Sequence, residues 1–439
     1  MPNAPVPFSQ QAQRTHEQPI SYFMQQALEN PGLISLAAGL VDEPSLPAHE
    51  VAQTFAEVFA SPASARSALQ YGTTYGYLSL RKRLLERFAA EEGLQPESLA
   101  LTADDVIITN GSQQLLYMLS EVLLNPGDIV LTEAPSYFVF HSVLTSHGAE
   151  VIGIPMDEHG LRTDLLETLL LRLEQTDRLD RVKMIYTVDY FQNPSGLSLA
   201  PERRRQLLEL ARRFSKRHRI MIVEDAAYRE LRYDDPDVRS IKCLDTTNEY
   251  VIYTGTFSKA CSPGIRVGYG LLPRELVKPV LWTKGNHDFG SANLNQHLVE
   301  RLLGNGSYNR HVSELRATYK AKRDVMHDAL TAAFREWPGV KWTRPAGGMY
   351  FWLRFPAEVP TGPRSALMAE CLREGVLYIP GQFCHVTDSA GRLATNEARL
   401  CFGIAKVDEI KEGVRRLAKA AKRLTELQGP APECPAVVA

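Results

Sequence analysis

The stretch YTGTFSKACSPGIRVGY, residues 253–269, places one lysine between hydroxyl side chains directly after a short apolar run. The run is typical of a buried strand, so the turn that follows would present Lys259 at the strand's carboxyl end. Thr256 and Ser258 flank this lysine, and Arg266 lies shortly after it. A desolvated amine is nucleophilic at neutral pH, and hydroxyl groups with a guanidinium suit a phosphate dianion. The stretch therefore indicates an imine to a phosphorylated aldehyde cofactor, although an isolated Ser-Lys pair more often belongs to a solvated loop.

Length and composition limit the class of protein. A chain of 439 residues exceeds one typical core and predicts two domains, and 44% hydrophobic with 23% charged residues is typical of soluble globular proteins. A formal charge of −2 favours neither nucleic acid nor a membrane surface as a partner. The cysteines form no C-x-x-C pair and the histidines no H-x-x-x-H spacing, so we expect reduced thiols and no metal. Neither a secretory signal nor a membrane span is recognisable, which predicts a cytoplasmic protein.

The central part of the chain alternates short β-rich runs with longer helical segments. This alternation predicts an α/β fold whose large domain has a mostly parallel, seven-stranded sheet sandwiched by helices. In such a sheet, ligands bind beyond the carboxyl ends of the strands. The predicted strands are residues 106–109, 129–132, 150–154, 182–187, 220–223, 250–253 and 267–271.

The rhythm changes after about residue 276, and this change predicts a smaller α+β domain. A long helix at 307–334 precedes strand-like runs at 348–353, 376–379 and 398–402, and a final helix covers 407–427. The expected organisation is a flexible arm (1–19), an N-terminal segment joining the small domain (20–70), a large cofactor-binding domain (71–305), a small domain (306–428) and a disordered tail (429–439).

Polar residues follow several predicted strands. Ser112 and Gln113 open a helix after Asn110-Gly111, where free backbone N–H groups suit a phosphate, although an ordinary helix cap has the same pattern. Tyr137 in EAPSY has the flat ring needed to stack on an aromatic cofactor, or else is a core residue.

Three further residues carry donors or charge at such positions. Asn193 in FQNPSG is an amide donor suited to a phenolate oxygen, although the motif is also an ordinary turn. Asp225 in EDAAY is a desolvated carboxylate that suits a protonated pyridine nitrogen, or caps a helix. Arg399 interrupts an apolar strand, where it would bind a substrate carboxylate or an internal acidic residue.

The order and type of these motifs resemble the class I/II aminotransferases, which are fold-type-I pyridoxal-phosphate (PLP) enzymes. Within that family the similarity is greatest to the branch of 2-aminoadipate and kynurenine aminotransferases and MocR-like regulators. It covers about residues 20–427. The motifs are TNGSQQ (109–114), EAPSY (133–137), FQNPSG (191–196), EDAAY (224–228), TFSK (256–259), PGIRVGY (263–269) and ARLCF (398–402).

The resemblance implies pyridoxal 5′-phosphate as cofactor and a role for each matching residue. Lys259 would form the Schiff base and carry the transferred proton, and Asp225 would pair with the pyridine nitrogen. Tyr228 and Asn193 would bind the phenolate oxygen, and Tyr137 would stack on the ring.

The remaining matches concern the phosphate and the substrate. The phosphate ligands would be Ser112, Gln113, Thr256, Ser258 and Arg266. Tyr71 would reach the phosphate of a neighbouring subunit, which implies a homodimer with shared active sites. Arg399 and Gly39, with Asn193, would bind the substrate.

The expected function is therefore transfer of an amino group from an α-amino acid to a 2-oxo acid. A PLP-dependent lyase, cyclase or oxidase is the alternative, and residues around Gly39, Tyr71 and Tyr190 would decide between them. A ligand-sensing regulator is disfavoured because only about 20 residues precede the match. The predicted helix 22–29 lacks the arginine of 2-aminoadipate-type relatives, so an acidic side chain is not supported. Tyr22, Phe23 and Tyr75 hint at an apolar or aromatic-tolerant pocket, although packing is the commoner role of such residues.

Overall fold

A large twisted sheet forms the centre of the larger domain in the computed structural model, which describes residues 6–30, 32–337, 339–386 and 393–428. All seven predicted strands lie in this sheet. Neighbouring strands pair in parallel from β8 through β7, β6 and β3 to β4, whereas β9 runs antiparallel to both β2 and β8. In sheet order the strands are β2 (Val106–Thr109), β9 (Gly268–Leu271), β8 (Val251–Thr256), β7 (Met221–Asp225), β6 (Val182–Thr187), β3 (Ile129–Ala134), β4 (Glu150–Asp157) and β5 (Gly160–Leu161).

The eighth strand, β5, is an addition to the predicted sheet. It pairs antiparallel with the end of β4 through Met156 and Asp157. Two residues are too few to give a periodic pattern, so the sequence carried no signal for it.

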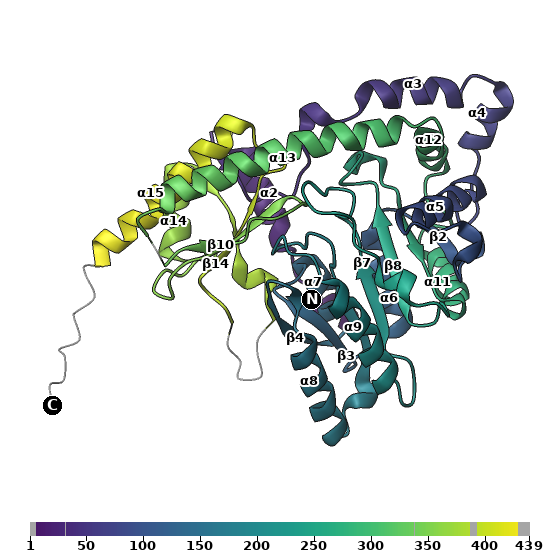
Figure 1. Ribbon diagram of the computed structural model, residues 1–439, viewed down its shortest axis with the longest axis horizontal. Helices are drawn as coiled ribbons and strands as arrows, with labels where there is room; N and C mark the ends of the chain where they lie inside the picture. Colours follow the sequence, from purple (N-terminus) through teal and green to yellow (C-terminus); the bar gives the residue numbers. More distant parts are fainter. Residues whose placement is uncertain (1–5, 31, 338, 387–392, 429–439) are drawn as a thin grey trace, which may run out of the picture.

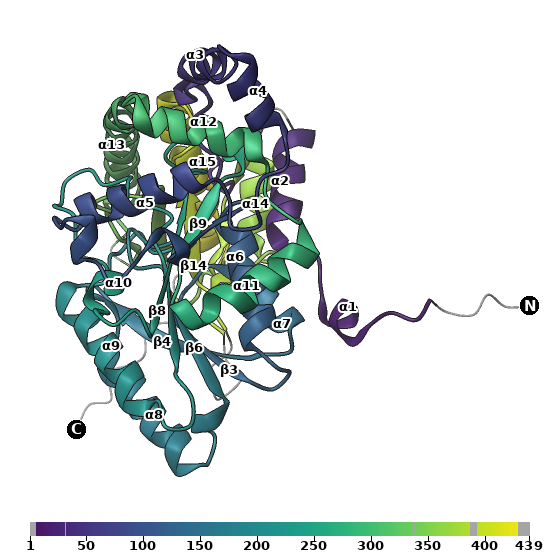
Figure 2. The same ribbon diagram turned by 90° about the vertical axis from the view of Figure 1, so that its right-hand side faces the viewer.

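Helices cover both faces of the sheet because its strands are apolar on both sides. In β6, Met184 and Tyr186 belong to one core cluster, whereas Val182 and Ile185 belong to the other. The helices of this domain are α5 (Leu78–Glu91), α6 (Ser112–Leu123), α7 (Phe138–Ser146), α8 (Thr163–Gln175), α9 (Pro201–Phe214), α10 (Ile241–Leu244), α11 (Arg274–His287) and α12 (Asn293–Gly304). Figure 2 shows α8 and α9 on one side of the strands and α6, α7 and α11 on the other.

The smaller domain is built on a four-stranded antiparallel sheet, as the change of rhythm predicts. In sheet order its strands are β10 (Lys341–Trp342), β11 (Tyr350–Arg354), β14 (Glu397–Cys401) and β13 (Ile379–Pro380). The strand β12 (Val376–Leu377) instead pairs in parallel with β1 (Ile34–Ser35). The helices are α13 (Ser307–Phe334), α14 (Ala366–Glu374) and α15 (Val407–Gln428).

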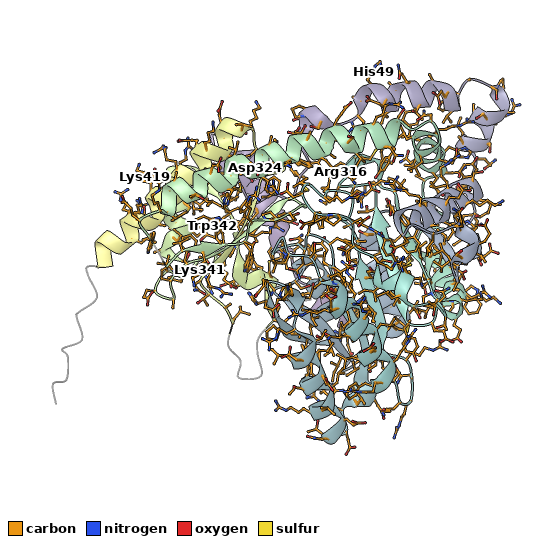
Figure 3. The ribbon with its side chains drawn as sticks, viewed as in Figure 1. His49, Arg316, Asp324, Lys341, Trp342 and Lys419 are labelled. Carbon is orange, nitrogen blue, oxygen red and sulfur yellow. The ribbon has the colours of Figure 1, made fainter. Side chains whose placement is uncertain are left out.

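Helix α13 contacts both domains along its length (Figure 1). In the first half of the helix, Arg316 Nε donates to the Glu230 carbonyl of the large domain at 2.6 Å. Near its second half, Asp324 accepts from Arg344 of the small domain at 2.8 Å; Figure 3 labels Arg316 and Asp324 on this helix. One continuous helix thus fixes how the two sheets are spaced.

The N-terminal segment divides between the two domains, which differs from the expectation that residues 20–70 join the small domain. Helix α2 (Pro19–Glu29) leads to β1 on the small domain, but α3 (Ala48–Val58) and α4 (Pro62–Leu69) lie beside α12 (Figure 1). Asn293 Nδ2 of α12 donates to the Ser67 carbonyl at 2.9 Å. Helices α3 and α4 therefore pack on the large domain through α12.

Residues 10–14 also differ from the flexible arm that the sequence predicts for 1–19. A short helix, α1 (Gln10–Arg14), lies against the large domain, where Arg14 Nε donates to the Ser146 carbonyl at 3.2 Å and Gln11 Nε2 to Tyr117 Oη at 3.0 Å. The expected tail at 429–439 lies outside the described residues. Short 3-10 turns lie at Glu43–Ser45, Pro96–Ser98, Ala103–Asp105, Leu179–Arg181, Pro263–Ile265 and Gly381–Cys384.

Within the described ranges, no helix combines the length and the apolar character that crossing a bilayer requires. The same part of the chain has no cluster of three or more metal-ligating side chains.

Candidate active site

A cavity of about 170 Å³ lies at the carboxyl edge of the large sheet. Because β6, β7 and β8 are parallel, the polar segments that follow them meet at this edge. The helix start of α6 closes one side. The lining residues are Ser112, Gln113, Tyr137, Val188, Asn193, Asp225, Ala227, Tyr228, Thr256, Ser258, Lys259, Pro263 and Arg266.

Ten of the predicted site residues, from six separate sequence motifs, are therefore brought together. Gly39 and Arg399 contact the site from the side of the small domain, as described below. Tyr71 does not line this cavity.

Lys259 occupies the middle of the site. Its Nζ donates to the Gly39 carbonyl at 2.9 Å. Desolvation lowers the pKa of this amine to about 8, and the neighbouring Arg399 and Arg266 act in the same direction. A larger fraction of the amine is thus neutral at physiological pH than in an exposed lysine, which makes it a better nucleophile and proton acceptor.

Asp225 forms the acidic end of the cavity. Its carboxylate accepts hydrogen bonds from Tyr186 Oη at 2.9 Å and from the Ala227 N–H at 3.2 Å. Burial raises the pKa of Asp225 to about 6, because these neutral donors do not fully offset desolvation. No cation pairs with this carboxylate among the described residues. A ring nitrogen that carries a proton supplies the missing partner, so the site fits a pyridinium.

The opposite end of the cavity collects donors for an anion. Gly111 caps α6 with φ 73°, and a Cβ there would lie 2.6 Å from Arg266 Nη2, so only glycine lets the guanidinium approach the helix start. Arg266 Nη1 donates to Ser258 Oγ at 3.3 Å, and Thr256 Oγ1 donates to the same hydroxyl at 3.1 Å. A helix N-terminus, hydroxyl groups and one arginine are a typical phosphate site.

Arg399 links the small domain to this cavity. Its Nη1 donates to Asn193 Oδ1 at 2.8 Å and its Nη2 to the Ala37 carbonyl at 2.7 Å, whereas its buried Nε has no hydrogen-bond partner. Among the described residues, no acidic side chain pairs with this buried guanidinium. This excludes, for that part of the chain, the internal partner that the sequence left open, and it leaves the positive charge available to a bound anion.

Tyr350 is a residue of the site that the sequence reasoning missed. It lies on β11, is buried, and its hydroxyl is 3.2 Å from Tyr228 Oη. The run GMYFWL, residues 348–353, is almost wholly apolar, and its pattern predicts only a strand. The hydroxyl in that run is the one signal that distinguishes Tyr350 from its neighbours. Tyr186 was missed for the same reason.

Two tyrosines discussed from sequence lie elsewhere. Tyr71 is 82% exposed and packs edge-on against Phe289, with ring centroids 5.8 Å apart. Tyr190 is buried, with the guanidinium carbons of Arg204 and Arg229 at 4.2 and 5.0 Å from its ring centroid. Tyr190 therefore stabilises the loop before Asn193 and does not shape the cavity.

The family model described as aminotransferase class I and II matches residues 31–417. The chain belongs to the class I and II aminotransferases. This aminotransferase is 34% identical over 397 residues to aromatic-amino-acid aminotransferase 1 of Thermococcus litoralis, covering 90% of this chain and 89% of that one. It is 34% identical over 403 residues to the 2-aminoadipate transaminase of Thermus thermophilus, covering 91% and 92%.

A solved structure gives the same result for the fold. The crystal structure of the Pyrococcus horikoshii kynurenine aminotransferase has a TM-score of 0.85 and 34% sequence identity, covering 95% of this chain and 97% of that one. The fold-type-I architecture, pyridoxal 5′-phosphate as cofactor and aminotransferase activity follow, and the lyase, cyclase or oxidase alternative is set aside. The amine, buried carboxylate and anion cradle of the cavity fit this cofactor.

The lowered pKa of Lys259 gives a testable pH dependence. Only the neutral amine attacks an aldehyde, so the rate at which the apoenzyme regains its visible absorbance with pyridoxal phosphate should rise with pH and level off above about 8. At pH 7 roughly one amine in ten is then neutral, against fewer than about one in a thousand for an ordinary lysine. Stopped-flow absorbance between pH 6 and 10 measures this rate. A rate that keeps rising beyond pH 10 would contradict the desolvated amine.

Proposed function

We propose that this aminotransferase moves an amino group from an α-amino acid to a 2-oxo acid, with Lys259 as the covalent attachment point and proton carrier. The observation that carries the proposal is the shared cavity of a nucleophilic Lys259 amine and a buried, unpaired Asp225 carboxylate. When bound, pyridoxal phosphate supplies an electron sink for the bonds at the amino acid Cα. The Nζ of Lys259, once released from the cofactor, would accept the Cα proton and return it, on the same face, to the cofactor carbon to which the lysine had been attached.

The large-domain residues hold and orient the cofactor in this proposal. Asp225 keeps the ring nitrogen protonated, Tyr137 stacks on the ring, and Tyr228 and Asn193 donate to its phenolic oxygen. The phosphate is held by Ser112, Gln113, Thr256, Ser258 and Arg266. The donor types and their position in one cavity support these assignments.

Arg399 is the proposed ligand of the substrate carboxylate, with the backbone of Gly39 and the amide of Asn193 beside it. Support comes from the buried guanidinium without an acidic partner among the described residues, and from the Asn193–Arg399 hydrogen bond of 2.8 Å. Binding of a carboxylate here would place Cα near Lys259 and exclude water from the arginine.

Removal of the lysine tests the covalent role. Lys259→Ala should purify without the visible absorbance of a lysine-bound cofactor, and turnover should fall by at least about 10²-fold, because both the attachment and the proton carrier are lost. The measurements are absorbance spectra and the half-reaction followed on adding an amino acid. Lys216→Ala, an exposed lysine away from the cavity, is the matched control and should keep both properties. Retained transamination in Lys259→Ala would refute the assignment.

We propose that the preferred amino donors carry neutral, aromatic or large apolar side chains. Helix α2 contains no basic residue that would bind an acidic side chain. Phe23, Phe138 and Phe383 pack together beside Arg399, with centroid distances of 6.1 Å for Phe23–Phe383 and 6.5 Å for Phe138–Phe383. The Arg399 guanidinium carbon lies 5.6 Å from the Phe138 ring centroid. The similarity to aromatic-amino-acid aminotransferase 1 of Thermococcus litoralis agrees with this preference.

A donor comparison tests the substrate class. Phenylalanine should convert the cofactor at least about tenfold faster, per unit concentration, than aspartate, because burying an aromatic ring contributes about 2 kcal/mol or more. Single-turnover absorbance changes give the rate of cofactor conversion, per unit concentration, for each of the two amino acids. Phe23→Ala should reduce the ratio, whereas Phe59→Ala, which changes an exposed phenylalanine at the C-terminal cap of α3, should not. Equal or faster conversion of aspartate would contradict the proposal.

We also propose a homodimer whose active sites are shared. Large apolar side chains of α4, of α11 and of the segments that follow these helices are exposed: Leu69, Tyr71, Trp282 and Phe289, of which Tyr71 and Phe289 contact each other. Exposed clusters of this kind mark association surfaces. Tyr71 would then reach the phosphate of the partner, in agreement with its exposure and its absence from its own cavity.

Dimer formation is testable at Trp282, which is 69% exposed on α11. Trp282→Glu should halve the mass seen by light scattering and reduce cofactor retention, because a charge would be buried and Tyr71 would lose its target. Leu171→Glu changes an exposed leucine on α8 and should leave the mass unchanged. A monomeric wild-type protein with full activity would overturn the shared-site proposal.

For the domain division we propose the boundaries 71–305 and 306–428, with residues 20–70 contributing to both parts. A cytoplasmic location is proposed as well. Five cysteines of the described residues are free thiols, which suits a reducing compartment: Cys243, Cys261, Cys371, Cys384 and Cys401.

A further inference from the structure

The hydroxyl of Tyr350 enters the active site from the small domain. Its strand, β11, pairs with β14, which also carries Arg399. The rings of Tyr350 and Tyr228 meet edge to face, with centroids 5.6 Å apart and an interplanar angle of 79°, and their hydroxyl oxygens are 3.2 Å apart. Tyr350 is buried and does not line the cavity. Any effect of its hydroxyl on bound ligands must therefore pass through Tyr228.

The surroundings indicate which hydroxyl donates. Tyr228 Oη already accepts from Asn193 Nδ2 at 3.4 Å, and Tyr228 lines the cavity. In the described part of the chain, the Tyr350 hydroxyl has no hydrogen-bond partner other than Tyr228. Burial raises the pKa of both phenols, so both keep their protons at neutral pH. If Tyr350 donates to Tyr228, the Tyr350 proton has an acceptor and the Tyr228 proton is left to point toward the cavity, where a bound ligand can accept it.

The Tyr350 hydroxyl lies close to the backbone of Gly39. A Cβ on Gly39 would stand 2.6 Å from Tyr350 Oη, so the absence of a side chain at residue 39 is what lets the hydroxyl reach Tyr228. On its other side, the Tyr350 ring lies under the Arg399 guanidinium, with 4.4 Å from the guanidinium carbon to the ring centroid. The ring and the hydroxyl therefore have separate neighbours, and a substitution by phenylalanine removes only the hydroxyl contact.

We propose that Tyr350 is a positioning residue whose hydroxyl donates to Tyr228 and makes Tyr228 a stronger donor toward the phenolic oxygen of the cofactor. The proposal rests on the function assigned to Tyr228 above. A hydroxyl that accepts a hydrogen bond donates a stronger one, because the two bonds polarise each other. The small domain, which carries the substrate-binding arginine, thereby adjusts a cofactor contact of the large domain.

The direction in which the Tyr350 hydroxyl shifts the pKa of the lysine-bound nitrogen follows from these contacts. With the cofactor bound, its phenolic oxygen would accept from Tyr228 and also from the protonated nitrogen that joins Lys259 to the cofactor. A stronger bond from Tyr228 draws charge from that oxygen, weakens its hold on the nitrogen-bound proton and lowers the nitrogen's pKa. Loss of the Tyr350 hydroxyl should therefore raise this pKa.

The test is a pH titration of the visible absorbance of the holoenzyme. In Tyr350→Phe the midpoint should rise by roughly 0.3–1 pH unit, the range expected for one hydrogen bond. Tyr378→Phe is the matched control, because it removes a buried hydroxyl of the same domain that donates to the Thr361 carbonyl at 2.9 Å, away from the cavity. Its midpoint should equal that of the wild type.

A double-mutant cycle separates action through Tyr228 from a general structural effect. The shift caused by Tyr350→Phe should vanish in a Tyr228→Phe background. Gly39→Ala, which displaces the hydroxyl without altering Tyr350 itself, should raise the midpoint and serves if Tyr350→Phe folds poorly. Because the Gly39 carbonyl also contacts Lys259, this shift counts as support only if it too vanishes in the Tyr228→Phe background. An unchanged midpoint in folded Tyr350→Phe, or an equal shift in the Tyr228→Phe background, overturns the role of Tyr350. A visible band retained by Lys259→Ala overturns the proposed function instead.

Discussion

Parallel pairing of β6, β7 and β8 is the constraint on which the active site depends. Each of these strands is buried on both faces, so its polar residues are confined to the segment that follows its carboxyl end. Because these strands run in one direction, Asp225 and Lys259 lie at the same edge of the sheet. There they line a cavity of about 170 Å³. Desolvation at that edge moves both pKa values toward neutrality, down for the amine and up for the carboxyl. The same burial that stabilises the sheet thus prepares the reactive groups.

The second domain completes the site with positive charge and hydroxyl groups. Arg399 and Tyr350 lie on adjacent strands, β14 and β11, and reach Asn193 and Tyr228 of the large domain. Neither of these contacts is an ion pair. At the cavity, the small domain therefore meets the large one through groups that can exchange partners when an anion arrives.

Much of the fold was predictable, because strands buried on both faces give continuous apolar runs and their ends carry the polar residues. Seven strands of the large sheet and the long helix α13 followed from these patterns. The placement of α3 on α12 did not, because an amphipathic helix shows which face is buried but not against what. For the site, motifs led to residues such as Lys259 and Arg399, whereas Tyr350 was hidden in an apolar strand. Resemblance to a family supplied the roles that spacing alone left open.

Helix α13 has a mechanical consequence. Its 28 residues span about 42 Å, and it is anchored to Glu230 in one domain and to Arg344 in the other. A rod-like helix that is attached near its middle to both domains, at Arg316 and at Asp324, opposes a free swing of one sheet about the other. Adjustment of the small domain around a substrate is then limited to sliding of packed side chains along the rod, a shear movement rather than a hinge.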